Sequence, residues 1–539
     1  MQELTGKVAL AAPQSLTDPD FLRDVLDLLD KLMEGGDLRI SLMPMLKIAD
    51  SYTFQDPRTL AKQHDAFANK HNLFEFLSNT YLLKPETIFL DPIPDDLALK
   101  YSYLNDLRLG GIDFFALVPV VFDEALIGVI EVYPQKQRKL TLAMIDRLLL
   151  AYNPLNIYFQ KARLSYDTVI DNFLKDNCTV LQPAVQWRFN KAARQAICLQ
   201  PEQSKLEIDL IKFEKVYPVY GAIDVRNSTL NRNWALKQDL KLQIGHLILL
   251  LQKIALVTQL ELIQQKKSNC EIWLEKIDQD EIFEDSLLAY YLETDIHPFL
   301  KELEISAPIE MPEVDFYFSL LDENIGAAFE NRRLLEESMK LVVGKLNDSV
   351  AEMNREAQQI YPCYFEKFQT DGVEYDFYIG QSITPQQTFF QFHLQSIRLL
   401  QLSNMISIAR MANDIKAELP VSIELTQLIF LQPHCIDIRF RGDERRFDVE
   451  GAYNIRYHIV KKRIDKVHIY GTNERLTMPG KIAIVFISTV DAEELRGHIQ
   501  YFQKKGFLAD DLELLELEPL QGIIGLKALR VGIKYAINI

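Results

Sequence analysis

The sequence predicts a multidomain α+β protein with an antiparallel sheet and flanking helices, a helical middle region with long helices, and a C-terminal α/β domain. Its 539 residues exceed what one hydrophobic core usually organises. Hydrophobic residues make up 48% and charged residues 25% of the chain, which is the balance of a folded globular protein. The apolar pattern changes twice along the chain, which places the predicted domains at residues 1–165, 166–361 and 362–539.

The first domain centres on a predicted β-hairpin. Residues 114–121 (FFALVPVV) form a near-continuous apolar run, an acidic turn follows, and residues 126–133 (LIGVIEVY) form a β-branched return strand. A helix is expected over residues 19–34, where apolar residues recur at helical spacing. Another helix is expected from Thr141, whose hydroxyl can cap its first turn. Pro154 interrupts this helix before a second helical stretch.

The middle domain is mostly helical in pattern. Its one irregular piece is predicted at residues 215–231 (KVYPVYGAIDVRNSTLN). The predicted helix over residues 230–265 is apolar on more than one side, so it should be buried or paired. A second long helix, over roughly residues 329–359, carries apolar residues at alternating three- and four-residue steps. This spacing fits a helical hairpin within the chain or a parallel homodimer, and we favour the hairpin.

The C-terminal domain, residues 362–539, alternates predicted strands and helices. Period-two and continuous apolar runs predict strands at residues 373–380, 421–430, 436–440 and 481–487. Helical spacing predicts helices at residues 389–417, 453–466 and 491–505. Short apolar segments at residues 514–518 and 528–534 complete this mixed α/β pattern.

The net charge of −17 and the pI near 5.1 argue against nucleic acid or an anionic membrane as a partner, although a local basic surface remains compatible with them. The amino terminus lacks the long apolar core of a signal peptide. The most apolar helical stretch, residues 244–257, contains His246 and Lys253 and is too short to span a bilayer. We therefore expect a cytoplasmic protein without a membrane span.

No metal or cofactor is expected. The five cysteines are far apart and form no CxxC pair, which is typical of reduced, buried thiols. His64 and His71 would share one helix face, but two ligands without a third nearby are better explained as a polar helix surface.

Two stretches of the first domain resemble GAF domains. Residues 104–112 (LNDLRLGGI) lead into the predicted hairpin, and residues 139–162 (KLTLAMIDRLLLAYNPLNIYFQKA) resemble the closing GAF helix. The wider sequence resembles a group of large, uncharacterised bacterial GAF-domain-containing proteins, whose members tend to carry a further N-terminal region without a counterpart here. This resemblance is carried by residues 177–189, 216–233, 368–382, 439–466 and 473–486.

The resemblance implies a pocket for a small molecule on one face of the sheet and terminal helices that dimerise. It does not imply which ligand binds. Asn69, Lys70 and Phe74 are similar to the start of a cyclic-nucleotide pattern, but Ser78 and Asn79 replace the expected acidic pair. A covalently attached bilin within this domain is excluded because no cysteine precedes residue 178.

Basic residues gather in the C-terminal domain. Residues 439–481 hold eleven Lys and Arg against six Asp and Glu, in a chain that is otherwise acidic. Arginine forks onto phosphate and carboxylate groups, so this segment is a candidate anion-binding site. The candidate residues are Arg439, Arg441, Arg445, Arg446 and Lys481. We favour the alternative that the arginines form an internal network with Asp448, Glu450 and Glu474.

The sequence thus predicts a non-enzymatic sensory or regulatory protein that binds a small ligand or partner through the GAF-like domain. No assembled catalytic motif supports an enzyme. The alternative is an enzyme or module that binds a nucleotide or phosphorylated metabolite through the Arg/Lys cluster. Homodimerisation through residues 230–265 and 329–360 is a third hypothesis.

Overall fold

The chain folds into two compact units. The structure, a computed structural model, describes residues 1–12, 19–33, 38–48, 51–54, 76, 85–134, 140–177, 182–199, 211–258, 260–279, 284–306, 312–432, 434–450, 457, 461, 463–487, 489–520 and 523–535. Unit 1 comprises Met1–Ile211 and Arg439–Phe447. Unit 2 comprises Lys212–Ile438 and Asp448–Ile539. The sequence-based division into three domains therefore differs from these two units.

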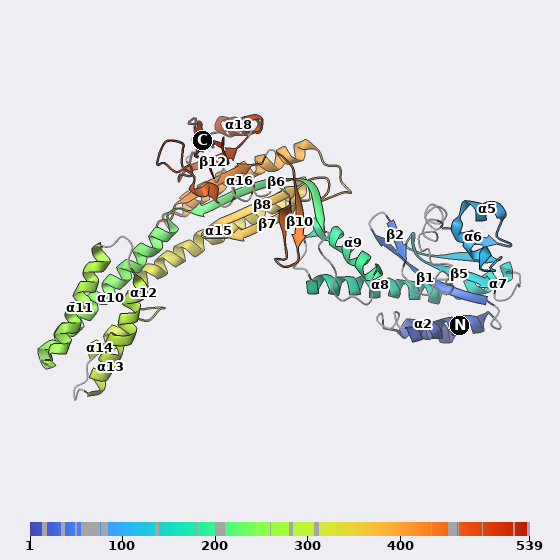
Figure 1. The fold of residues 1–539 in the computed structure, drawn as a ribbon, viewed down its shortest axis with the longest axis horizontal. Coiled ribbons are helices and arrows are strands. Elements are labelled where there is room, and N and C mark those ends of the chain that lie inside the picture. The colour runs from blue at the N-terminus through green and yellow to red at the C-terminus, as the bar shows by residue number, and fades with distance from the viewer. Residues whose placement is uncertain are drawn as a thin grey trace. The chain divides into compact units, whose positions relative to one another are not determined.

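Among the described residues, unit 1 contains an antiparallel five-stranded sheet in the order β2-β1-β5-β4-β3. Its strands are β1 (Leu38–Ile48), β2 (Ser51–Phe54), β3 (Ile88–Leu90), β4 (Phe115–Phe122) and β5 (Ala125–Pro134). Strands β1, β2 and β5 are labelled in Figure 1. The predicted hairpin is confirmed as β4 and β5. Its turn residues Asp123 and Glu124 both have positive φ, 53° and 62°, as tight hairpin turns require.

Helices cover both faces of this sheet. One apolar cluster joins alternate residues of β4, such as Ala116 and Val118, to α1 (Gln2–Leu10), α2 (Pro19–Leu32), α7 (Leu142–Leu149) and α8 (Tyr152–Asn177). The opposite face, with Phe115 and Leu117, packs against α5 (Asp95–Lys100) and α6 (Ser102–Leu109). The helix α9 (Pro183–Leu199) follows α8. Both sheet faces thus carry apolar clusters among the described residues, and the α5–α6 side also buries Glu131, whose carboxylate accepts a 2.7 Å hydrogen bond from the Tyr103 hydroxyl.

Two expectations about this region are corrected. Thr141 does precede α7 in an extended conformation, but its side chain makes no capping hydrogen bond. The helix α8 runs without a break through residue 165, so the boundary predicted there falls inside a helix. Pro154 lies in the first turn of α8, where proline is tolerated because no intrahelical partner is lost.

A mixed sheet of nine strands among the described residues forms most of unit 2, and only Arg439–Phe447 of its strands β10 and β11 are counted with unit 1. The order is β11-β10-β6-β9-β12-β14-β13. In addition, β8 pairs with β6, and β7 pairs with β8. The strands are β6 (Lys212–Val225), β7 (Tyr364–Gln369), β8 (Val373–Ile379), β9 (Leu425–Leu431), β10 (Ile436–Arg441), β11 (Arg446–Glu450), β12 (Lys481–Phe486), β13 (Glu513–Glu516) and β14 (Lys527–Gly532). β9 and β12 are parallel, and β12 and β14 are antiparallel.

The strand β6 replaces the irregular piece that the sequence predicted. It pairs with β8 over residues 217–223 and with β9 over residues 219–225, both antiparallel. Residues 218–223 are all buried, so they show no alternation of exposure that would mark a strand. Gly221 is required where the Tyr375 ring crosses the strand, because a Cβ there would lie 2.4 Å from the ring.

The other described elements of unit 2 are mostly helices, some long and some short. They are α10 (Ser228–Thr258), α11 (Glu261–Gln279), α12 (Asp285–Tyr291), a π-helical turn (Leu292–Ile296), α13 (His297–Ser306), α14 (Pro312–Ser319), α15 (Glu330–Ile360), α16 (Gln391–Ile415) and α18 (Thr489–Lys504). The prediction of α15 is confirmed. The helix predicted over residues 230–265 is two helices, because α10 ends at Thr258. Most of the helix predicted over residues 453–466 lies outside the described residues.

The helices α10 to α14 share an apolar core, and we call residues 236–321 the helical arm (Figure 1). Asp239 of α10 connects this arm to the first turn of α15. Its buried carboxylate accepts hydrogen bonds from the backbone N–H groups of Asn331 (2.9 Å) and Arg332 (3.1 Å). It also accepts bonds from the Asn331 amide and the Arg332 Nε, both at 2.9 Å. Two amides that lack partners within α15 are thereby satisfied.

Candidate ligand-binding site

The five predicted anion-binding residues do not belong to one compact unit. Arg439, Arg441, Arg445 and Arg446 lie on β10, β11 and the turn between them, a segment that belongs to unit 1, whereas Lys481 belongs to unit 2. None of these residues is without a partner. Arg441 lies 3.5 Å from Asp443, and the Arg446 Nε donates a 2.5 Å hydrogen bond to Glu444. Asp443 and Glu444 thus pair with Arg441 and Arg446 within this turn.

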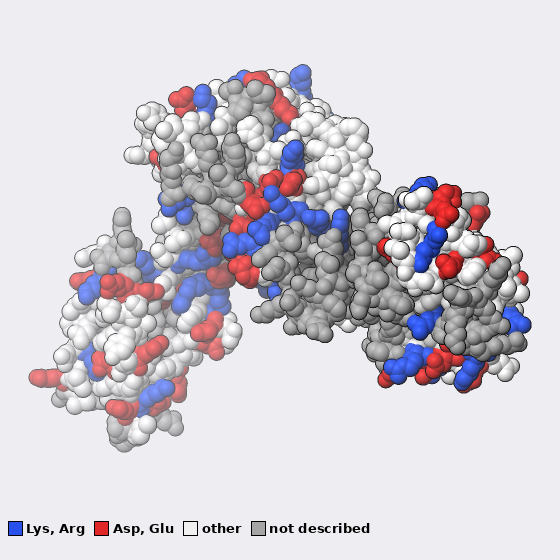
Figure 2. Space-filling view, turned by 45° about the vertical axis from the view of Figure 1, so that its right-hand side comes forward, with Lys and Arg blue, Asp and Glu red and all other residues white. Residues whose placement is uncertain are grey.

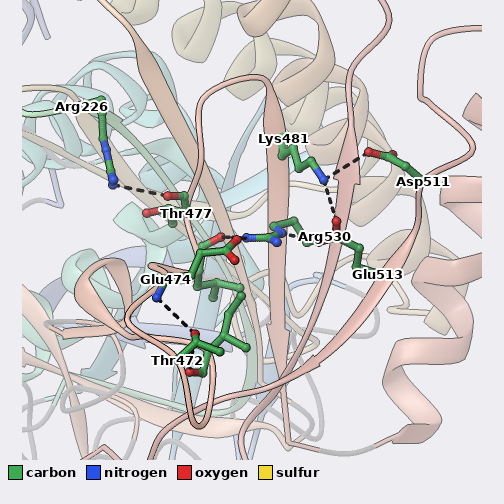
Figure 3. Close-up of polar contacts among 10 residues, drawn as sticks. Arg226, Thr472, Glu474, Thr477, Lys481, Asp511, Glu513 and Arg530 are labelled. Carbon is green, nitrogen blue, oxygen red and sulfur yellow. Dashed lines mark hydrogen bonds and ion pairs between the residues drawn. The ribbon is translucent and has the colours of Figure 1, made fainter.

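Lys481, at the start of β12, belongs to a polar network in unit 2 (Figure 3). It forms ion pairs with Glu513 at 2.7 Å and with Asp511 at 3.3 Å. The hydrogen bond to Glu513 raises the pKa of Lys481 above its usual value. The buried Arg530 of β14 bonds to Glu513 at 2.5 Å and to Glu474 at 2.7 Å. These contacts hold the segment before β12 against the sheet.

This segment, residues 472–480, carries one wall of a cavity. Thr477 is buried, and its carbonyl oxygen accepts a 3.4 Å hydrogen bond from the guanidinium of Arg226 (Figure 3). The Glu474 N–H donates to the Thr472 hydroxyl at 3.2 Å. Arg475 lies between these two anchored positions, and its side chain lines the cavity. The network therefore positions Arg475 without bonding to its guanidinium.

The cavity has a volume of about 550 Å³, within the range of small-molecule sites. It lies where β6 ends and α10 begins. Its lining residues are Tyr220, Ala222, Ile223, Asp224, Val225, Asn227, Ser228, Thr229, Leu230, Thr370, Asp371, Glu374, Lys461, Lys466 and Arg475. The lining combines an apolar strand face with hydroxyl, carboxylate and cationic side chains.

Lys461 lies at a buried ion pair beside the cavity. Its ammonium pairs with the fully buried carboxylate of Asp376 and lies 5.1 Å from the centre of the Tyr220 ring. The Tyr457 hydroxyl donates a 2.6 Å hydrogen bond to the same carboxylate. Burial, together with the charge of Asp376, raises the pKa of Tyr457 well above its usual value. Tyr457 therefore remains a neutral donor, and Lys461 is held in one position.

The first turn of α10 forms another wall. The Ser228 hydroxyl donates to Asp371 at 2.6 Å, and both terminal nitrogens of Arg232 bond to the same carboxylate at 2.8 and 2.9 Å. The hydrogen bonds from Arg232 and Ser228 lower the pKa of Asp371. Asp371 is therefore ionised and already neutralised by Arg232. The amino end of a 31-residue helix adds a partial positive charge to this wall.

Lys466 and Arg475 differ from the other charged residues of the lining. Both side chains are exposed, and neither forms an ion pair with another residue in the part of the chain that the structure describes. Asp224 and Glu374 also line the cavity, so the walls are not uniformly basic. The arrangement suits a polar ligand that carries an anionic group together with hydroxyl or amino groups.

Sequence reasoning counted Lys461, Lys466 and Arg475 within the basic segment but did not select them. Their distinguishing feature is the first turn of α10, more than 200 residues earlier in the chain, and no local pattern indicates that contact. His64 and His71 lie outside the described residues, as do Asn69, Lys70 and Phe74. Within the described ranges, no three His, Cys, Asp or Glu side chains gather as metal ligands would.

Comparison with protein-family models found no match, and comparison with curated proteins also found none. The resemblance of residues 104–162 to GAF domains therefore stays a prediction from the sequence.

Proposed function

We propose that this chain is a non-enzymatic regulatory protein that binds a small anionic metabolite in the cavity at the start of α10. The observation that carries the proposal is the position of Lys466 and Arg475. Both line a cavity of ligand size, beside the positive end of a long helix, and neither has a carboxylate partner among the described residues. A phosphate or carboxylate group would supply that partner.

A regulatory role is supported by where the cavity lies. Its wall includes the first turn of α10, and α10 continues into the helical arm. Ligand contacts with Ser228 and Thr229 would therefore act on a helix whose other end lies in a different part of unit 2. A bound molecule that prefers one position of α10 shifts the protein toward that position by its differential affinity.

This proposal moves the ligand from the GAF-like domain to unit 2. In unit 1 the described side chains of α5, α6 and the sheet form an apolar core that also buries the carboxylate of Glu131, and no cavity of ligand size is described there. The alternative of an enzyme or nucleotide-binding module based on the arginine cluster has less support, because Arg446 and Lys481 are bonded to carboxylates.

Isothermal titration calorimetry with pyrophosphate, nucleotides, sugar phosphates and dicarboxylates would test the proposal. We expect at least one compound to bind, and the variant Lys466→Gln/Arg475→Gln to bind it about tenfold or more weakly. The variant Lys345→Gln/Arg355→Gln on α15 removes the same charges away from the cavity and should bind normally. Equal loss in both variants, or no binding by the wild type, would overturn the proposal.

A further inference from the structure

The helix α10 presents an apolar stripe that the described residues leave uncovered. Leu242, Leu249 and Leu256 recur every seven residues along it, as in helices that pair with other helices. Leu249 is 58% exposed and Leu256 is 80% exposed. Phe316 of α14, 55% exposed, continues the stripe onto the neighbouring helix. Leu249, Leu256, Phe316 and Tyr317 line a groove of about 350 Å³.

The opposite side of α10 is packed within the arm. Ile244, Leu247 and Leu251 are fully buried there, and Asp239 on this helix holds the start of α15. Among the described helices, α10 is the one whose length and composition would suffice to cross a membrane. Only 33% of its most apolar window is buried. Insertion of α10 into a bilayer would break the four hydrogen bonds that Asp239 accepts and would leave its carboxylate in the membrane. We therefore expect the exposed stripe to contact another protein surface and not lipid.

We propose that the groove between α10 and α14 is the docking surface for a second copy of this chain, in a twofold pair with α10 of each copy over α14 of the other. A twofold interface must be self-complementary, because the same patch supplies both sides. The groove meets this condition. In such a pair the apolar residues of the groove would contact the same residues of the second copy. Lys253, at one border, and Glu313, at the other, would each pair with the opposite charge of the second copy.

The charges decide between the two twofold arrangements. Lys253 of α10 and Glu313 of α14 lie opposite each other across the groove, 3.7 Å apart, with both side chains largely exposed. A twofold axis along the groove places α10 over α14 of the second copy, so that each Lys253 meets the Glu313 of the other chain. An axis across the groove at this level would instead place Lys253 over Lys253. Like charges in an interface are strongly disfavoured.

This surface is independent of the cavity at the start of α10. None of the residues named for the groove lines that cavity. Loss of ligand binding and loss of pairing can therefore be observed separately, and failure of one proposal leaves the other standing.

Sedimentation velocity combined with light scattering would test the pairing. We expect the wild type to sediment as a dimer, and Leu249→Glu/Leu256→Glu to sediment as a monomer with unchanged helical circular dichroism. Leu341→Glu, at an exposed leucine of α15, is the matched control and should stay dimeric. Each of the single variants Lys253→Glu and Glu313→Lys should dimerise about tenfold or more weakly, because like charges then face each other.

Mixing the two charge variants provides the sharpest measurement. In an equimolar mixture of Lys253→Glu and Glu313→Lys, each altered side chain meets an opposite charge on the other copy, so heterodimers should form with nearly wild-type affinity. The ion pair within each chain stays broken, so only contact between copies can give this rescue. A monomeric wild type, a mixture no tighter than the single variants, or wild-type binding to neutral lipid vesicles would overturn the proposal.

Discussion

Replacing Asp239 by alanine should weaken unit 2 more than any surface change. The buried carboxylate accepts four hydrogen bonds from Asn331 and Arg332 at 2.9–3.1 Å. Removing it leaves the Arg332 guanidinium without its ion-pair partner and two amides of α15 without acceptors. Breaking one side of a buried pair costs about 3–5 kcal/mol. We therefore expect Asp239→Ala to lower the free energy of unfolding of this region by about 3–5 kcal/mol, and Asp239→Asn to lower it by about half as much.

Hydrogen exchange measured by mass spectrometry on residues 330–340 is the suitable assay, because it reports the stability of this helix start apart from unit 1. Asp278→Ala is the control: Asp278 also pairs with a residue of α10, Lys241, but its side chain is 56% exposed. Asp278→Ala should lower the free energy of unfolding by no more than about 0.5 kcal/mol. A loss below about 1 kcal/mol for Asp239→Ala would refute the role assigned to this carboxylate.

Three further predictions concern other parts of the chain. Gly128→Ala should destabilise unit 1 by about 1–3 kcal/mol in urea unfolding, because its Cβ would lie 2.4 Å from the Phe159 ring. Burial raises the pKa of Cys363 to about 12, so iodoacetamide at neutral pH should alkylate the exposed Cys435 and spare Cys363 in the native protein. Burial raises the pKa of Glu513, but hydrogen bonds from two basic neighbours outweigh burial and hold it below its usual 4.5. The stabilisation from the ionised Glu513 is therefore complete above pH 4.5 and is lost as the pH falls through the lowered pKa. In Glu513→Gln, the urea concentration at the unfolding midpoint should therefore fall less steeply as the pH is lowered.

Each of these has its own check. Gly6→Ala, in a helix with open space around the glycine, should stabilise slightly, and similar effects at Gly128 and Gly6 would contradict the packing argument. Equal alkylation of Cys435 and Cys363 would show that the latter thiol is accessible. If the urea unfolding midpoint of Glu513→Gln falls with decreasing pH as steeply as that of the wild type, the ion pairs of Glu513 do not stabilise the fold.

Local periodicity was sufficient for several elements. The hairpin of β4 and β5 and the helix α15 were predicted nearly to the residue, because each has a strong pattern within one short segment. The end of α10 at Thr258 was missed, since the apolar pattern continues into α11. The predicted boundary at residue 165 failed because no helix-breaking residue marks it.

Elements that depend on distant partners could not be predicted in this way. The strand β6 contains Pro218 and Gly221, which normally argue against a strand, and its buried positions follow from neighbours far along the chain. The same limit applies to the cavity. Lys466 and Arg475 resemble the other basic residues of their segment, and only the fold places them beside the first turn of α10.

The position of β6 determines how this protein can be divided. Each long edge of the strand is occupied, by β8 on one side and β9 on the other. A fragment that begins at residue 362 would keep β8 and β9 but lack the strand between them, leaving two open apolar edges. Such edges recruit strands from other molecules and lead to aggregation. A soluble fragment of unit 2 must therefore begin before Lys212, so that β6 is synthesised with the strands it joins.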